Sequence, residues 1–248
     1  MGDGKWMTES RYIFQFPIFA PMDVFGDALT DFYKTGVADV VLLHNSYDDP
    51  EEMPVDFFFR DEEEMPALEL QALHMCEGKV LDIGAGVGSH ALVLQAFNVD
   101  VTAIDVSEAA VNIMKDRGVK KALLQDIFTF REKFDTILML MNGIGLTGTL
   151  PGFKSFLINL KNLINPGGRV LFDTSDIAYL YKDFPKPQNQ YYGEVSYQYE
   201  YKGKKGNWFN WLYVDPETIK IMAKETGWNS EIIFDDEEDQ YLVKLTLV

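Results

Sequence analysis

Residues 80–88 read VLDIGAGVG, and residues 101–105 read VTAID. The apolar residues at 80, 81 and 83 suit a strand that is buried on both faces. The glycines at 84, 86 and 88 let the chain turn tightly and bring bare main chain against a ligand. A helix over 88–97 would then point its unpaired N–H groups and positive dipole end into the same crevice. The stretch predicts a strand, a glycine-rich turn, a helix and a second strand.

An acidic residue, Asp105, closes the second strand about 20 residues after Gly84, and a carboxylate there can accept two hydrogen bonds from a ribose diol. A glycine triplet alone is a weak signal, because tight turns also use glycine for structural reasons. The order of elements together with the spaced carboxylate indicates a site for an adenosine-containing cofactor. Both nicotinamide and adenosyl cofactors have a ribose that a carboxylate at this spacing could bind.

Five segments resemble, in order, those of the class I S-adenosylmethionine (SAM) dependent methyltransferases, over about residues 70–175 and more weakly to the C-terminus. They are the glycine motif at 82–88, the ribose acid Asp105, the segment 125–127 that flanks adenine, the fourth strand at 134–140 and the turn and fifth strand at 165–172. In the family, the acid two residues before the first glycine is associated with the amino group of the cofactor's methionine, which here implies Asp82.

The resemblance implies SAM as cofactor, S-adenosyl-L-homocysteine as product, and a Rossmann-like, doubly wound α/β fold. Its sheet would have seven strands, mostly parallel, with an antiparallel C-terminal edge. The implied cofactor-binding residues are Asp82, Gly84, Ala85, Gly86, Gly88, Asp105, Val106, Asp126, Ile127 and Asn142.

An NAD-dependent dehydrogenase fits less well. The nicotinamide fingerprint needs glycine or alanine at its sixth position, where this chain has Ser89. A second carboxylate, Asp126, follows the third strand, and the chain lacks the residues for a separate substrate domain of dehydrogenase size.

The composition limits the partners. The 248 residues carry 39 acids against 22 bases, a net charge of −17, so a polyanion would be repelled and we expect no nucleic-acid substrate. No apolar stretch is long enough for a membrane span. The N-terminus has no basic segment followed by an apolar stretch, so we expect no secretory signal. The single cysteine, Cys76, and three scattered histidines indicate no metal site and agree with a cytoplasmic location.

We expect two parts, a cap at 1–61 that covers the substrate and a methyltransferase core at 62–248. An amphipathic helix is predicted over 62–77, because apolar residues recur there at three- and four-residue spacing. Residues 1–10 are expected to be a flexible leader, and 12–25 an aromatic segment wrapped over the core. Further helices are predicted near 27–33, 108–117, 152–164 and 217–226, and final strands near 230–234 and 240–248.

A β-hairpin with one aromatic face is predicted at about 193–214, inserted after the fifth strand. Tyrosines at 197, 199 and 201 alternate with polar residues, and Phe209, Trp211 and Tyr213 repeat the alternation. The hairpin can line a substrate pocket with rings. Its rings can instead pack on the cap or across a homodimer interface.

The sequence defines the methyl acceptor less well than the cofactor. SAM itself supplies the reactivity, and a general base is needed only if the nucleophile arrives protonated. The segment 141–145 replaces the Asn-Pro-Pro-Tyr sequence of many base-amino methyltransferases, which leaves the nucleophile open. Candidate catalytic or orienting groups are His44, Tyr47, Asn142, Tyr192 and Trp208. We expect a methyltransferase acting on a small-molecule acceptor. The alternative is a SAM-binding protein whose cap and hairpin hold a protein partner.

Overall fold

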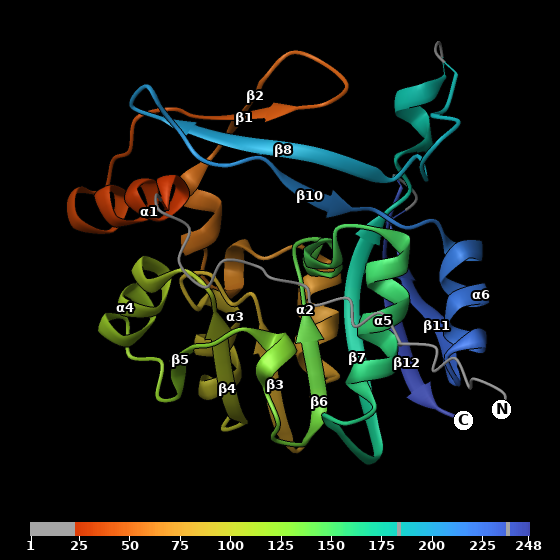
Figure 1. Cartoon of the computed structure of the whole chain (residues 1–248). Helices are drawn as coiled ribbons and strands as arrows, with labels where there is room; N and C mark the ends of the chain where they lie inside the picture. The colour runs from red at the N-terminus through yellow and green to blue at the C-terminus, as the bar shows by residue number, and fades with distance from the viewer. Residues whose placement is uncertain (1–22, 183–184, 237–238) are drawn as a thin grey trace, which may run out of the picture.

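A seven-stranded sheet forms the centre of the computed structural model, which describes residues 23–182, 185–236 and 239–248 (Figure 1). The strands lie in the order β11-β12-β7-β6-β3-β4-β5. Their bounds are β3 Lys79–Ile83, β4 Asp100–Asp105, β5 Ala122–Leu124, β6 Phe134–Met139, β7 Ile164–Ser175, β11 Trp228–Asp235 and β12 Gln240–Leu247.

The first five of these strands in the chain run parallel, and β12 lies antiparallel to both β7 and β11. The carboxyl ends of β3, β4, β5 and β6 therefore meet at one edge of the sheet. The strand order reverses between β3 and β6, which is where α/β sheets bind ligands. The predicted fold class, with its antiparallel C-terminal edge, is confirmed.

Helices cover both faces of the sheet, as predicted. One face packs on α5 (Leu150–Leu160) and α6 (Pro216–Glu225), and the other on α2 (Ala67–His74), α3 (Ser89–Ala96) and α4 (Glu108–Asp116). Successive strand residues go to opposite sides, so Leu81 joins the first cluster and Val80 the second. Both side chains are fully buried, which is why apolar residues stand at two successive positions of this strand.

A second sheet lies over the carboxyl ends of the parallel strands (Figure 1). We call it the covering sheet. Its main path is β10-β8-β1-β2, with β9 paired to β8. The bounds are β1 Val41–Asn45, β2 Glu51–Met53, β8 Glu194–Tyr201, β9 Lys204–Lys205 and β10 Phe209–Leu212. Strands β8 and β10 form the predicted hairpin, and β1 pairs with β8 across the molecule.

The N-terminal segment is attached to the core beside the end of β4. Helix α1 (Val24–Thr35) is capped by Asp23, whose other carboxylate oxygen accepts a hydrogen bond from the Ser107 hydroxyl. The helix ends at Gly36, which adopts the left-handed conformation typical of a C-terminal cap. A methyl group at Gly26 would lie 2.8 Å from the Ala109 side chain, so α1 and α4 approach closely.

The predicted helix over 62–77 is wrong in extent. A short 3-10 turn, η2 (Glu62–Glu64), precedes α2, and the break falls at Pro66, whose extended backbone precedes the first helical residue. Helix α5 begins two residues earlier than predicted because Thr149 caps it and Pro151 fits the first turn. The expected leader and most of the aromatic segment 12–25 lie outside the described residues. No helix in the described ranges has the length and apolar character needed to cross a bilayer.

Candidate active site

The glycine turn after β3 contacts the acid that ends β4. The Gly86 N–H donates to Asp105 Oδ2 at 2.9 Å, and the Ser107 N–H donates to Oδ1 at 2.8 Å. Burial raises the pKa of Asp105, while these two backbone donors favour its charged form. Each carboxylate oxygen keeps a second acceptor position. The carboxylate is thus held in a fixed orientation and can still accept hydrogen bonds from a ligand.

The three glycines of the turn all have positive φ angles, but an added side chain would meet different surroundings at each of them. A methyl group on Gly84 would meet no protein atom within 4 Å, and one on Gly86 would meet only the Phe58 ring, at 3.8 Å. A methyl group on Gly88 would lie 2.7 Å from Val119 and 2.9 Å from Met114. Gly88 is therefore needed for packing of the helix on the fold, whereas Gly84 leaves open space in the crevice.

Asp82, the last but one residue of β3, has a carboxylate oxygen without a partner. The residue is 1% exposed, and its Oδ2 makes no hydrogen bond. Desolvation raises the pKa of Asp82 to about 6, although the electrostatic attraction of His90 acts to lower this pKa. A buried, unpartnered carboxylate oxygen is costly in a folded protein. A cationic group bound beside it would remove this cost.

Asn142 follows β6 in a strained turn. Both Met141 and Asn142 have φ near +60°, an uncommon conformation for residues with side chains. The Asn142 N–H donates to both carboxylate oxygens of Asp173, at 2.9 and 3.0 Å, which holds the turn against β7. The side-chain oxygen of Asn142 is buried and has no partner. Burial raises the pKa of Asp173 to about 6.

The remaining residues of the predicted cofactor set lie along the same edge. Val106, directly after Asp105, is 65% exposed, an apolar side chain left uncovered beside the carboxylate. Asp126 caps the 3-10 turn η3 (Ile127–Thr129) by accepting from the Phe128 N–H at 2.9 Å, and Ile127 is buried beneath it. Ala85 lies in the glycine turn, and its N–H donates to the Ile104 carbonyl.

A buried ionic network, which the sequence analysis missed, supports the turn from below. Glu69 on α2 pairs with Arg60 at 2.7 Å and with His90 on α3 at 2.8 Å. Burial works against ionisation of Glu69, but His90 and Arg60 hold its pKa below the usual value. His90 is only 7% exposed. The one sequence signal for this network is that Glu69 falls on the apolar face of its helix, in line with Leu73.

The 3-10 helix η1 (Val55–Phe59) is tied to the glycine turn. The Ser89 hydroxyl donates to the Phe58 carbonyl at 2.8 Å, and Arg117 donates to the Val87 carbonyl at 2.9 Å and reaches the Phe59 carbonyl. Phe58 packs edge-on against Phe25 of α1. The N-terminal segment thereby forms one wall beside Gly86.

The candidates for acceptor chemistry other than Asn142 fall into two groups. Tyr47 and Tyr192 are hydrogen-bonded, Tyr47 to Glu51 and Tyr192 to Asp176, each at 2.7 Å. His44 lies on the outer face of the covering sheet and contacts Glu200 at 2.7 Å. Trp208 is 54% exposed in the turn before β10. We therefore leave His44 and Trp208 out of the candidate site.

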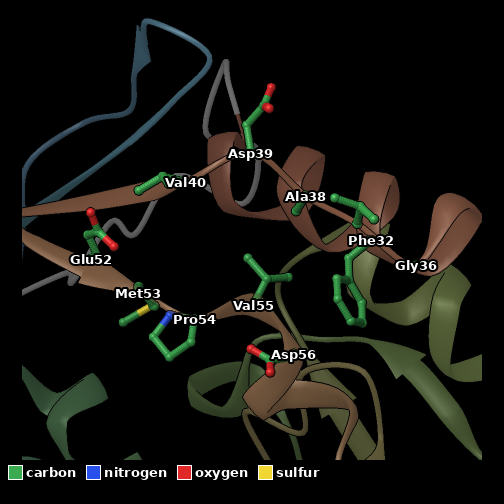
Figure 2. A pocket seen from close by; sticks show the side chains of 11 residues that line it. Phe32, Gly36, Ala38, Asp39, Val40, Glu52, Met53, Pro54, Val55 and Asp56 are labelled. Atoms are coloured by element: carbon green, nitrogen blue, oxygen red, sulfur yellow. The ribbon is translucent and has the colours of Figure 1, made fainter.

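Two cavities border the N-terminal segment rather than the glycine turn. One, of about 480 Å³, lies between α1 and the chain at 52–56, with Phe32, Met53 and Val55 among its lining residues (Figure 2). The other, of about 650 Å³, includes Phe32 and Arg60. Within the part of the chain that is described, no three His, Cys, Asp or Glu side chains are grouped so that they could hold a metal ion.

Comparisons with known proteins agree with this geometry. A family model described as a methyltransferase domain matches residues 55–231. The chain is 40% identical to a SAM-dependent methyltransferase from Bacteroides fragilis, crystallised with S-adenosyl-L-homocysteine. The TM-score is 0.86, with 93% of this chain and 97% of that chain covered.

More distant structures share the fold alone. The CcbJ methyltransferase from Streptomyces caelestis is 14% identical, with a TM-score of 0.57 over 73% of this chain and 93% of that chain. A SAM-dependent methyltransferase from Clostridium acetobutylicum is 15% identical, with a TM-score of 0.52 over 72% and 87%. No curated protein sequence matches the chain.

Proposed function

The chain belongs to the SAM-dependent methyltransferases, and from this premise we propose that it methylates a small molecule held between the carboxyl edge of the core sheet and the covering sheet. SAM is its cofactor, and supplies a methyl group bonded to a positively charged sulfur. The family match favours this activity over a dehydrogenase or a SAM-binding protein without catalysis.

The proposed cofactor site rests on one observation. Two buried acceptor oxygens, Asp82 Oδ2 and Asn142 Oδ1, lack partners at the ends of neighbouring strands, beside the contact of Gly86 with Asp105. In our proposal Asp82 accepts from the amino group of the methionine part, and Asp105 accepts from the ribose hydroxyls. Val106 and the segment around Asp126 and Ile127 would border adenine, and the open space at Gly84 would admit the cofactor against the main chain.

The proposed acceptor pocket lies under the covering sheet. The Trp211 indole is seated on the turn after Asn142, since a methyl group at Gly145 would be 2.0 Å from the indole nitrogen. Strand β10 therefore rests on η4 (Gly143–Thr147), and its aromatic residues face the reaction edge. Aromatic walls exclude water and help to align the nucleophile with the methyl group. The charge of −17 disfavours a polyanionic acceptor, which supports a small molecule over a nucleic acid.

We further propose that residues 1–61 act as a cap on the core at 62–248. The pairing of β1 with β8 supports this, because the N-terminal segment and the inserted hairpin then form one covering sheet. A cytoplasmic location is proposed on the single cysteine, which is buried and unpaired.

Calorimetry with S-adenosyl-L-homocysteine tests the cofactor site. Asp105→Asn should weaken binding by about ten- to a hundredfold, because the carboxylate makes charge-assisted hydrogen bonds. Asp100→Asn is the matched control, an exposed acid at the opposite end of the same strand. Equal affinities of the two variants would mean that the ribose site lies elsewhere. Release of S-adenosyl-L-homocysteine from SAM with a panel of amines, phenols and carboxylates then tests the acceptor.

A further inference from the structure

A row of hydroxyl groups crosses the inner face of the covering sheet. Tyr213 Oη lies 3.1 Å from Tyr197 Oη, which lies 3.4 Å from Tyr47 Oη. Tyr47 donates to Glu51 Oε1 at 2.7 Å, and Glu51 is exposed. We call these four residues the phenol chain. It runs from the interior of the covering sheet to a carboxylate at the surface.

The register of the strands places the phenol chain on the face of the covering sheet that is directed toward the core. Glu51 is paired with Leu43, and Leu43 with Tyr199, so their side chains share that face. Tyr197 is paired with Phe209 on β10, two residues before Trp211. The residue after Tyr213 is anchored to the end of β7, where the Val214 N–H donates to Thr174 Oγ1 at 3.2 Å. Tyr213 thus lies close to the strand end that holds the Asn142 turn.

The hydrogen bonds have one direction, because each phenol has a single proton and the Glu51 carboxylate only accepts. Tyr47 donates its proton to Glu51, so the hydrogen bond between Tyr47 and Tyr197 must use the proton of Tyr197. Tyr197 then has no second proton to donate, so it accepts from Tyr213. Burial raises the pKa of Tyr197 and of Tyr213, so both remain neutral and carry their protons. The inner end of the chain therefore presents a phenol oxygen with a free acceptor position.

The surrounding side chains suit a cation. On the inner face of strands β1, β2, β8 and β10, none of the described side chains is a lysine or arginine. Rings gather there instead: the centroids of Tyr199 and Phe209 are 5.3 Å apart, and Phe209 is 6.2 Å from Trp211. Aromatic faces attract ammonium groups, and the acidic protein as a whole draws cations toward it.

We propose that the methyl acceptor is an amine that arrives as its ammonium form, and that the phenol chain takes up the proton it must lose. This inference rests on the proposed function. The ammonium nitrogen gives its proton to Tyr213 Oη, each phenol passes its own proton one step outward, and Glu51 receives the last proton and releases it to solvent. The nitrogen lone pair is then free for the methyl group. Tyr213 is the group that touches the acceptor, whereas Tyr197, Tyr47 and Glu51 are positioning residues.

Three probes of one shape test the substrate class: benzylamine, benzyl alcohol and benzoate, each titrated by calorimetry at pH 7.5 into protein saturated with S-adenosyl-L-homocysteine. The ammonium probe should bind at least about tenfold more tightly than the alcohol, and benzoate most weakly. Tightest binding of benzoate, or equal or absent binding of all three, would overturn the amine assignment. Saturation with S-adenosyl-L-homocysteine is measured first, so that a failure of the cofactor site is seen separately.

Variants of the phenol chain test whether these residues are what favours the ammonium group. Tyr213→Phe and Glu51→Gln should each remove most of the preference for the ammonium over the alcohol, and the double variant should do no more than the stronger single one. Tyr181→Phe is the control, since its hydroxyl donates to the Tyr192 carbonyl outside the chain. A merely structural role would lower the affinity for both probes alike and leave their ratio unchanged. If Glu51→Gln keeps the wild-type melting temperature and cofactor affinity, an unchanged ratio of ammonium to alcohol affinity would refute the proposed role of the phenol chain.

Discussion

Replacing Asp82 with Asn should stabilise the cofactor-free protein and weaken cofactor binding, two effects of opposite sign. Its pKa is raised from the usual 3.8 to about 6 because the carboxylate is buried. That difference corresponds to about 3 kcal/mol against the ionised form at neutral pH. The new amide has hydrogen-bonding needs of its own, so the net gain should be about 1–2 kcal/mol, or roughly 2–8 °C in melting temperature.

The pH dependence gives the sharper test. A raised folded-state pKa means that the native protein takes up the proton first, so the destabilisation by Asp82 is complete above about pH 6 and fades as the pH falls toward 4. The stability advantage of Asp82→Asn should therefore shrink by roughly 1.5 kcal/mol between pH 7.5 and pH 5. Chemical unfolding of the variant and the wild type at both pH values measures this difference, with Asp100→Asn as the control.

Calorimetry completes the experiment. The variant should bind S-adenosyl-L-homocysteine about ten- to a hundredfold more weakly, because a charged hydrogen bond to the amino group is lost. The reasoning fails if the cofactor-free variant is less stable than the wild type at pH 7.5 by more than about 1 kcal/mol while its affinity is unchanged. That combination would mean that the carboxylate has a structural partner and no role toward the ligand.

Four further substitutions separate packing from binding. Gly84→Ala should cost about 1–2 kcal/mol of stability and abolish most cofactor affinity, whereas Gly88→Ala should cost about 3 kcal/mol through its collision with Val119 and Met114; denaturant unfolding and calorimetry distinguish them. Glu69→Gln should lower stability by about 3–5 kcal/mol at pH 7, and this loss should diminish in acid as the wild-type carboxylate is protonated; urea unfolding at pH 7 and pH 4 shows either outcome. Gly145→Ala should displace the Trp211 indole and cost about 1–3 kcal/mol with little change in cofactor affinity, and a wild-type melting temperature would contradict the contact.

Local patterns were enough to predict the core. Buried parallel strands are short apolar runs, and the glycine turn with Asp105 needs residue types that few other structures require at that spacing. The contact between Gly86 and Asp105 follows from these patterns, because parallel strands bring their carboxyl ends to one edge. The same reasoning predicted where Asn142 lies.

Contacts between distant segments could not be predicted. Leu43 pairs with Tyr199, and nothing near either residue in the sequence indicates the other. His44 was among the candidate catalytic or orienting groups, but which face of a strand a residue occupies depends on that distant partner. Arg60 stands among acids in the sequence and yet pairs with the buried Glu69, which a charge pattern along the chain does not reveal.

A crystal structure of the protein with S-adenosyl-L-homocysteine is the most direct test of the cofactor site. We expect the ribose hydroxyls within hydrogen-bond distance of Asp105, the amino group beside Asp82 Oδ2, and the main chain at Gly84 and Gly86 against the ligand. A ligand bound away from the end of β3, or an Asp105 carboxylate that faces no ligand atom, would contradict the account.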